Sequence, residues 1–207
     1  MNYLEFRKSM LPFRVFSTKD IVKRFPDFDS RRLAEWQDKG YVLKLINKWY
    51  LLTETERSES LYFRISNCLV RPSYVSMETA LSCYNLIPES VFTVQAVTTM
   101  KSQQYDTEAG SYNCRSLKPS GFFGYKVIRE GDIPILFAEK EKAILDYLYL
   151  TPGISDKEDL AALRLNIAAT KDIDWEKFDH YAKVLNSKAL NRRIKIFKSF
   201  LADDVIE

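Results

Sequence analysis

The chain is poor in the residues that build metal and redox sites. Its 207 residues include a single histidine, His180, and three cysteines, Cys68, Cys83 and Cys114, which form no CxxC pair. A structural zinc site takes about four ligands of these types at short spacing, so we expect no metal. Scattered cysteines in odd number are typical of reduced thiols rather than of a disulfide framework. We therefore expect a cytoplasmic protein.

Long apolar runs are absent too. Wholly apolar stretches are only a few residues long, whereas a helix needs roughly 20 such residues to cross a bilayer. The N-terminal sequence MNYLEFRKSMLPF lacks the apolar core of a signal peptide, so we expect no membrane association. With 46% apolar residues, 29% charged residues and only six glycines, the composition is that of a globular chain. The length predicts one large domain or two small ones.

Motifs for enzyme chemistry are missing as well. Neither GxGxxG nor GxxxxGK[ST] occurs. A nucleophile would have only His180 as its base, and His180 lies in DWEKFDHYAKVL, which has the pattern of an amphipathic helix. Asp106 and Glu108, together with the run EKEK at 139–142, supply the residue types that hold Mg²⁺ in nucleases, but the nuclease spacing E-x-K is absent. We expect no catalytic residues and no cofactor, with a metal-dependent nuclease as the less favoured alternative.

Positive charge is unevenly distributed along the chain. Residues 1–53 hold 11 Lys and Arg against 6 Asp and Glu, whereas residues 54–207 hold 20 against 22. Near the C-terminus, residues 187–198 contain five basic side chains and no acid. Basic surfaces attract polyanions through Coulomb force and counterion release. An ordinary solvated surface is the alternative for an excess of this size.

The first part of the chain predicts two short helices. Its opening residues place apolar side chains on one helical face, at spacings of three and four: Tyr3, Phe6, Met10 and Phe13. In the next segment, FSTKDIVKRFP, Ser17 is a good N-cap and Asp20 favours the positive end of a helix. The side chains of this second helix that we expect to face inward are Ile21, Val22 and Phe25.

A third helix and a hairpin follow. In DFDSRRLAEWQDKG, Asp29 can cap a helix whose inner face is Leu33 and Trp36, and Gly40 can end it in the left-handed conformation. From residue 41 the apolar period changes to two. The strands YVLKLI and WYLL flank the pair Asn-Lys at 47–48, which predicts a two-residue hairpin turn.

Three helices followed by a hairpin are typical of a winged helix-turn-helix, in which the third helix lies in the major groove of DNA. An arginine on that helix offers a planar fork that matches guanine or phosphate. The candidate DNA-binding residues are Ser30, Arg31, Arg32, Glu35 and Lys39 on the third helix, Lys44, Asn47 and Lys48 on the wing, and Lys19 and Lys23 as phosphate contacts on the second helix.

Another interpretation of the same residues stays open. Arg31 and Glu35 also have the i,i+4 spacing of a surface ion pair, and Asp38 beside them opposes DNA. Winged helices also dock other proteins, so the alternative function is a protein-interaction module.

Residues 54–207 predict a second domain of the α+β class. The polar segment TETERSES (53–60) reads as the linker, and SLYFRISNCLV and YVSMETALSCYNLI predict helices, the second one capped at Ser76. Between residues 91 and 137, β-branched and aromatic stretches separated by AGS, KPSG and REGD predict four or five short strands in a small antiparallel sheet. Connections this short leave no room for the helical crossovers of a doubly wound parallel sheet.

The remaining segments predict helices. In AEKEKAILDYLYLTPG an apolar stripe faces inward, and Lys142 and Asp146 form a surface i,i+4 pair. Two or three more helices finish the chain. The last one carries basic residues on the faces away from its apolar stripe, as a candidate second nucleic-acid contact: Arg192, Arg193, Lys195 and Lys198. Amphipathic patterning favours a solvated face over that contact.

Three segments together resemble the AbiEi family of antitoxins from type IV toxin–antitoxin systems. They are YVSMETALSCYNLIPESVFTVQAVTT, SYNCRSLKPSGFFGY and FAEKEKAILDYLYL. The positions that match the family pattern are Tyr74, Ser76, Glu78, Ala80, Leu81, Leu86, Ile87, Pro88, Val97, Thr98, Thr99, Lys118, Pro119, Phe122, Phe123, Gly124, Tyr125, Ala138, Glu141, Lys142, Ala143, Leu145 and Asp146. The resemblance covers roughly residues 14 to 150, including the winged helix, and its segments are specific only in combination. It departs from the family at Lys48, where Gly is common in the wing turn, and at Lys140, where Pro is common.

The resemblance implies an antitoxin with two roles. The winged helix would bind inverted repeats in double-stranded DNA upstream of its own operon and repress it. The C-terminal domain would counter a toxin resembling a nucleotidyltransferase, without necessarily forming a stable complex with it. The last 50 residues resemble the family least.

Overall fold

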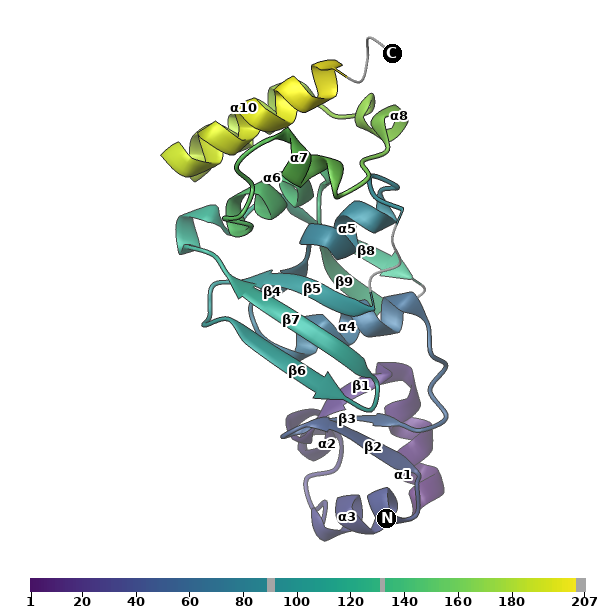
Figure 1. Ribbon diagram of the computed structural model, residues 1–207. Coiled ribbons are helices and arrows are strands. Elements are labelled where there is room, and N and C mark those ends of the chain that lie inside the picture. Colours follow the sequence, from purple (N-terminus) through teal and green to yellow (C-terminus); the bar gives the residue numbers. More distant parts are fainter. Residues whose placement is uncertain (89–91, 131–132, 204–207) are drawn as a thin grey trace.

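The computed structural model describes residues 1–88, 92–130 and 133–203. The chain is of the α+β class, and within these ranges its strands form a three-stranded antiparallel sheet and a six-stranded mixed sheet. The small sheet lies at the N-terminal end of an elongated molecule, the larger sheet lies in the middle, and a group of helices lies at the C-terminal end (Figure 1). No helix in the described part of the chain is long and apolar enough to span a bilayer.

The N-terminal part follows the predicted order of helices and hairpin, with one added strand. Its helices are α1 (Tyr3–Met10), α2 (Thr18–Arg24) and α3 (Arg31–Asp38), and its strands are β1 (Val15–Ser17), β2 (Val42–Ile46) and β3 (Trp49–Leu52). The sheet order is β1-β3-β2. Strand β1 was not predicted, because three residues are too few to show an alternating pattern.

Local signals placed the ends of these elements correctly. Ser17 and Asp20 form a reciprocal capping box at the start of α2, and Gly40 takes a φ of +69° after α3. The hairpin turns at residues 47–48, where Lys48 has a φ of +71°. A non-glycine residue in this region is uncommon and carries strain. A glycine at this position would remove that strain.

A compact core holds the N-terminal part together. The buried side chains of this core are Phe6, Met10, Phe16, Ile21, Leu33, Trp36, Val42, Tyr50 and Leu52. The inward directions predicted for Ile21, Leu33 and Trp36 are confirmed. The direction predicted for Val22 was wrong, because its side chain is 51% exposed. A residue adjacent to Ile21 is turned by about 100° on a helix and leaves the buried face.

The C-terminal part is larger and has both helices and strands. Its first elements are α4 (Glu59–Leu69), β4 (Ser73–Val75), α5 (Met77–Cys83), β5 (Thr93–Thr98), β6 (Gln103–Thr107), β7 (Gly110–Ser116), β8 (Tyr125–Glu130) and β9 (Ile133–Ala138). The helices that follow are α6 (Lys140–Leu150), α7 (Lys157–Ala161), α8 (Ile167–Thr170), α9 (Trp175–Leu185) and α10 (Lys188–Asp203). Strand β4 opens a segment that we predicted to be wholly helical, and α8 was not predicted.

The strand order of the large sheet corrects the antiparallel prediction. The order is β6-β7-β5-β4-β9-β8, and two of its pairings, β5 with β7 and β4 with β9, are parallel. The sheet is therefore mixed. Strand β6 folds back on β7 instead of on β5, so β7 lies between them and runs parallel to β5. Alternating apolar residues reveal that a segment is a strand, but they do not reveal its neighbour.

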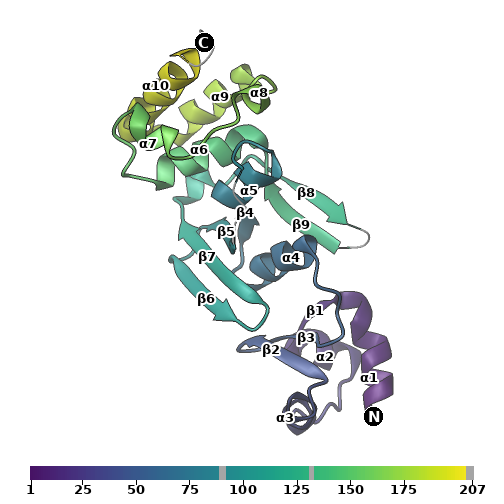
Figure 2. The same ribbon diagram turned by 45° about the vertical axis from the view of Figure 1, so that its right-hand side comes forward.

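Helices cover the large sheet. α4 lies against β4, β5 and β9, and α5 lies against β5 and α6. α9 and α10 pack in turn on α6 and build the helical end of the molecule (Figure 2). The inner face predicted for α10 is confirmed, since its apolar stripe is buried: Leu190, Ile194, Phe197 and Leu201.

The two parts share a packed boundary. Val15, Leu45 and Leu51 of the small sheet belong to the core of the C-terminal part, and the guanidinium of Arg71 lies 4.8 Å from the ring centroid of Trp49. One face of the small sheet thus packs on its own three helices, and its other face contacts the region of α4. The segment 53–58 connects the parts without isolating them.

Candidate nucleic-acid interface and buried polar cluster

Helix α3 is anchored through one face and open on the other. Leu33 and Trp36 are only 4% and 3% exposed. The Trp36 ring packs against Phe6, at a centroid distance of 4.6 Å, and against Phe28, at 5.9 Å. Because this aromatic contact fixes the helix, the opposite face stands in solvent, and the side chain of Arg31 is 90% exposed.

The charges on α3 are paired differently from the surface pair considered above. Arg31 does not pair with Glu35. Its guanidinium lies 2.9 Å from the Asp29 carboxylate, and Lys39 donates to Glu35 at 2.7 Å. The hydrogen bonds from Arg31 lower the pKa of Asp29. These pairs are solvent-exposed and screened, so phosphate oxygens can replace the carboxylates at little cost.

The start of α3 is occupied by its own chain. The N-cap position falls on Ser30, whose side chain makes no capping bond. The carboxylate of Asp29 accepts the backbone N–H of Arg31 at 3.0 Å instead. A phosphate that bound this helix end would have to displace Asp29.

The other candidate DNA contacts lie on neighbouring elements of the N-terminal part. Lys44 lies on β2, and Asn47 and Lys48 form the hairpin tip; all three side chains are exposed. Lys19 and Lys23 are exposed on α2. Of the ten candidates, Arg32 alone is partly buried, and the other nine are exposed. Acids accompany them, because Glu35 and Asp38 are exposed on α3 itself.

The basic residues of α10 divide into two groups. Arg193 donates to the main-chain carbonyls of Leu148 and Tyr149, at 2.9 and 3.2 Å, at the end of α6. Lys198 pairs with Asp179 at 2.6 Å. These two side chains hold helices together, and only Arg192 and Lys195 of the predicted set remain exposed.

The main feature that our sequence reasoning missed is a buried polar cluster. Lys142 and Asp146 were predicted to form a surface pair, but both side chains are 0% exposed and form an ion pair inside the protein. Tyr74 and Ser76 each donate to the Asp146 carboxylate at 2.8 Å, and Lys142 donates to the Tyr74 hydroxyl at 2.9 Å. Ser76 therefore stands at the N-cap position of α5 without the predicted capping bond.

Packing around Lys142 explains why the cluster is closed. The ammonium lies 5.2 Å from the Phe123 ring centroid and 5.4 Å from that of Tyr74. Gly124 has a φ of +69°, and a Cβ there would come within 3.0 Å of the Lys142 side chain. Burial lowers the pKa of Lys142, an effect that Asp146 opposes. Burial, reinforced by Asp146, raises the pKa of the Tyr74 hydroxyl.

A second set of polar contacts joins this cluster to α9. Glu141, 3% exposed, accepts the backbone N–H of Asp174 at 3.1 Å and lies 3.0 Å from the Lys177 ammonium. The Tyr181 hydroxyl donates to Glu139 at 2.6 Å. Residues from all three segments that carry the family resemblance thus meet at one place. The available signal was the 142–146 spacing, but spacing does not tell whether a pair faces solvent or core.

Glu78 belongs to the same motif but has a different environment. Its Oε2 is a buried oxygen without a hydrogen-bond partner among the described residues. Burial raises the pKa of Glu78, and the nearby Arg115 only partly opposes this.

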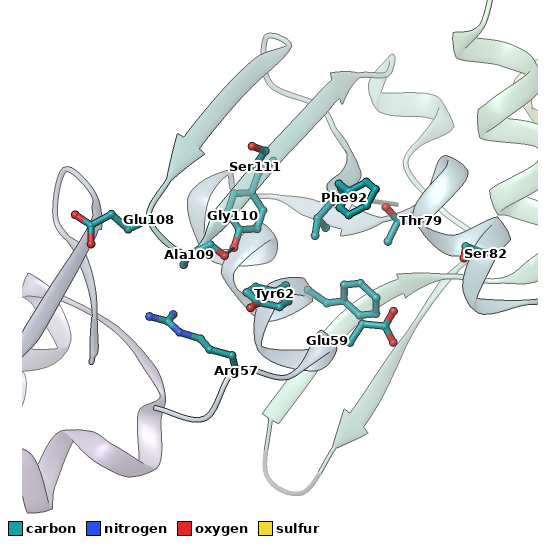
Figure 3. Close-up of a pocket in the computed structure, with 13 residues that line it drawn as sticks. Arg57, Glu59, Tyr62, Thr79, Ser82, Phe92, Glu108, Ala109, Gly110 and Ser111 are labelled. Carbon is teal, nitrogen blue, oxygen red and sulfur yellow. Dashed lines mark hydrogen bonds between the residues drawn. The ribbon is translucent and has the colours of Figure 1, made fainter. Parts of the chain in front are cut away.

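A separate pocket opens between the start of α4 and the β6–β7 hairpin (Figure 3). Its volume is about 570 Å³. Aromatic rings from Tyr62, Phe63 and Phe92 line it, and Arg57 points toward the end where Glu108 lies. The pocket has space for a small ligand, and the hydroxyl of Ser111 on its lining donates to the Asp106 carboxylate at 2.7 Å.

The acids considered for a nuclease lie apart. Asp106 is on the edge strand β6, four strands away from β9, which leads into the 139–142 run. At the usual strand spacing this is roughly 19 Å. Within residues 1–88, 92–130 and 133–203, no three His, Cys, Asp or Glu side chains are grouped as metal ligands. A comparison of the chain with known protein families and with curated proteins found no match.

Proposed function

We propose that this protein is a cytoplasmic, DNA-binding antitoxin of the AbiEi type, without enzymatic activity. The observation that carries the proposal is the exposed arginine edge of α3, which is anchored by Leu33 and Trp36 and accompanied by a lysine-tipped hairpin. In this proposal residues 1–53 act as a winged helix-turn-helix, with α3 in the major groove and the β2–β3 hairpin as the wing.

The proposal assigns a distinct task to each basic group. Arg31 and Arg32 read base edges, because a guanidinium can bind guanine through two hydrogen bonds. Lys39, Lys44 and Lys48 neutralise phosphates, which gives affinity without sequence preference. In the free protein the carboxylates of Asp29 and Glu35 pair with Arg31 and Lys39. On binding, groups of the DNA replace these carboxylates as partners.

The antitoxin part of the proposal is supported by the family resemblance and by the place in the fold where the matching residues meet. The matching positions Tyr74, Ser76, Lys142 and Asp146 are distant in sequence, yet they form one hydrogen-bonded cluster. Each side chain of this buried cluster needs the others as hydrogen-bond partners. Proteins that share the fold would therefore be expected to keep all four together. The functional partner is then a nucleotidyltransferase-like toxin, opposed by the C-terminal part.

A binding experiment tests the DNA proposal. The protein's own upstream region and a random duplex of equal length are titrated at several salt concentrations, with fluorescence anisotropy as the readout. We expect the upstream region to bind at least tenfold more tightly. Lys48→Ala should weaken both duplexes alike and reduce the salt slope by about one unit. Equal affinity of the wild-type protein for both duplexes would count against a repressor.

The toxin proposal needs a separate test. The reading frame next to the gene is expressed alone and together with this chain, and growth is measured. If the neighbour is toxic and the full chain restores growth, the antitoxin role is supported. If growth is not restored by the full chain, that role fails, whatever the DNA result.

Exposed acids on α3 favour one rival function. Glu35 and Asp38 would repel DNA but would suit a basic protein surface. In that case the N-terminal part docks a protein and never meets DNA. Capture of the same protein partner from nuclease-treated lysate, lost with Arg31→Ala, would support this rival.

A further inference from the structure

Helix α1 exposes an apolar face that nothing in the described chain covers. Phe6 and Met10 on its inner side are fully buried, but Leu4 on its outer side is 71% exposed and Leu11, just after it, is 37% exposed. Both ribbon views show α1 along the outer side of the N-terminal part (Figures 1 and 2). The apolar surface of Leu4 stays in contact with water, and a partner that covered it would gain the free energy of burying it.

More apolar side chains are exposed near α1 in the sequence or in space. Met1 is 38% exposed, Phe13 is 44% exposed and Tyr41 is 42% exposed. Tyr41 stacks on Tyr3 of α1 at a centroid distance of 4.4 Å, so it borders the helix start.

The spacing along α1 matches that of paired helices. Leu4 and Lys8 on α1 and Leu11 just after it follow one another at intervals of four and three, which are the spacings of the a and d positions of a heptad. Arg7 lies at the side of this stripe and donates to Glu54 at 2.8 Å. Its charge is therefore already compensated within the chain.

The charged residues of α1 indicate which partner fits this face and in which direction the partner helix runs. The exposed ionic residues on or beside the stripe are Glu5 and Lys8. When two α1 helices pack antiparallel about a two-fold axis near residue 6, Lys8 of each copy lies beside Leu4 and Glu5 of the other. Its methylene stem covers the leucine and its ammonium meets the carboxylate. A parallel pair would instead bring the two Lys8 side chains together.

We propose that two copies of this chain associate through the outer face of α1, packed antiparallel. The contact leaves α2, α3 and the β2–β3 hairpin uncovered, since the stripe lies opposite the side of α1 that packs on them. A two-fold pair presents two α3 helices, which suits a DNA site made of two inverted half-sites. The association itself does not depend on DNA and is measured without it.

Sedimentation equilibrium of the full chain tests the surface. We expect a concentration-dependent dimer for the wild type, and at least a tenfold weaker association for Leu4→Glu. The matched control is Val127→Glu, a 55% exposed apolar position on β8, which should associate as the wild type does. Circular dichroism checks that both variants fold. A wild type that stays monomeric at every concentration overturns the proposal, as does a dimer that Leu4→Glu leaves unchanged.

Charge reversal tests the direction. Glu5→Lys alone and Lys8→Glu alone should each weaken self-association. Mixed in equal amounts, the two variants should form a heterodimer as strong as the wild-type dimer, because each then offers the charge that the other lacks. Interactions within one helix cannot produce this recovery. Failure of the mixture to associate rules out the antiparallel contact.

Discussion

Two Lys–acid pairs in this protein have the same spacing in sequence and opposite surroundings. Glu35 on α3 and Lys39 at its C-cap have side chains 51% and 53% exposed, whereas Lys142 and Asp146 lie on α6 and are fully buried. The exposed pair is surrounded by water, so either side chain can exchange its partner for another ion. In the buried pair, the hydroxyls of Tyr74 and Ser76 make the hydrogen bonds that water makes at the surface. The first arrangement suits a surface that binds, and the second suits a core that must keep one geometry.

Removing one member of the buried pair should have the largest effect. Asp146→Ala leaves the Lys142 ammonium without its counter-ion and deprives Tyr74 and Ser76 of their acceptor. We expect a loss of about 3–5 kcal/mol in the free energy of unfolding, measured by urea denaturation. The double variant Lys142→Met with Asp146→Leu should lose less, because no charge stays buried. A cost for Asp146→Ala below about 1 kcal/mol would mean that the pair contributes little.

On the proposed DNA-binding surface, the largest effect is expected at Arg31. Arg31→Ala should reduce affinity for the upstream DNA roughly ten- to hundredfold and leave affinity for random duplex nearly unchanged, if the guanidinium contacts a base. The unfolding free energy should barely change, because the side chain is exposed. Fluorescence anisotropy and urea denaturation measure both. An equal loss on both duplexes would assign Arg31 to phosphate instead.

Glu78 offers an intermediate case, a partly buried acid whose Oε2 is buried and has no hydrogen-bond partner among the described residues. Its pKa is raised above the ordinary value of 4.5. The native state therefore keeps a proton that the unfolded chain has lost, and stability falls as the pH rises from 4.5 through the raised pKa. Glu78→Gln should stabilise the protein at pH 7 by an amount on the order of 1 kcal/mol. At pH 4 the gain should vanish. A gain of equal size at both pH values would show that ionisation is not its cause.

Breaking the exposed pair should have the smallest effect. Glu35→Gln removes the partner of Lys39 from α3, and we expect a melting temperature within about one degree of the wild type, since exposed pairs contribute little. Affinity for any duplex should rise slightly at low salt, because Lys39 is freed and a negative charge is lost. A marked drop in melting temperature would mean that this pair supports the fold, and would remove the contrast with α6.

Much of the N-terminal part could be predicted because its signals are local. The capping box at Ser17, the turn at Gly40 and the buried side of α3 depend on contacts within a few residues. The same holds for the apolar stripe of α10. Where such signals were too short, as in the three residues of β1, the prediction failed.

The candidate sites were only partly predictable. The exposure of Arg31 and of the hairpin lysines Lys44 and Lys48 followed from the pattern of apolar residues around them. The pairing of Arg31 with Asp29 did not, because flexible surface side chains choose among several acids. The intramolecular contacts of Arg193 and Lys198 depend on α6 and α9, which lie far away in sequence.

By itself the sequence determined the α+β class, the positions of most helices and strands, and the anchoring of α3, since each rests on short-range periodicity and capping. Only the tertiary structure decided the mixed strand order and the direction of Lys142. Both are set by partners 68 or more residues away or by strands that are not neighbours in the chain. A lysine and an aspartate one turn apart satisfy each other equally well in water or in a core, and whether the rest of the chain closes over them is decided by packing at long range.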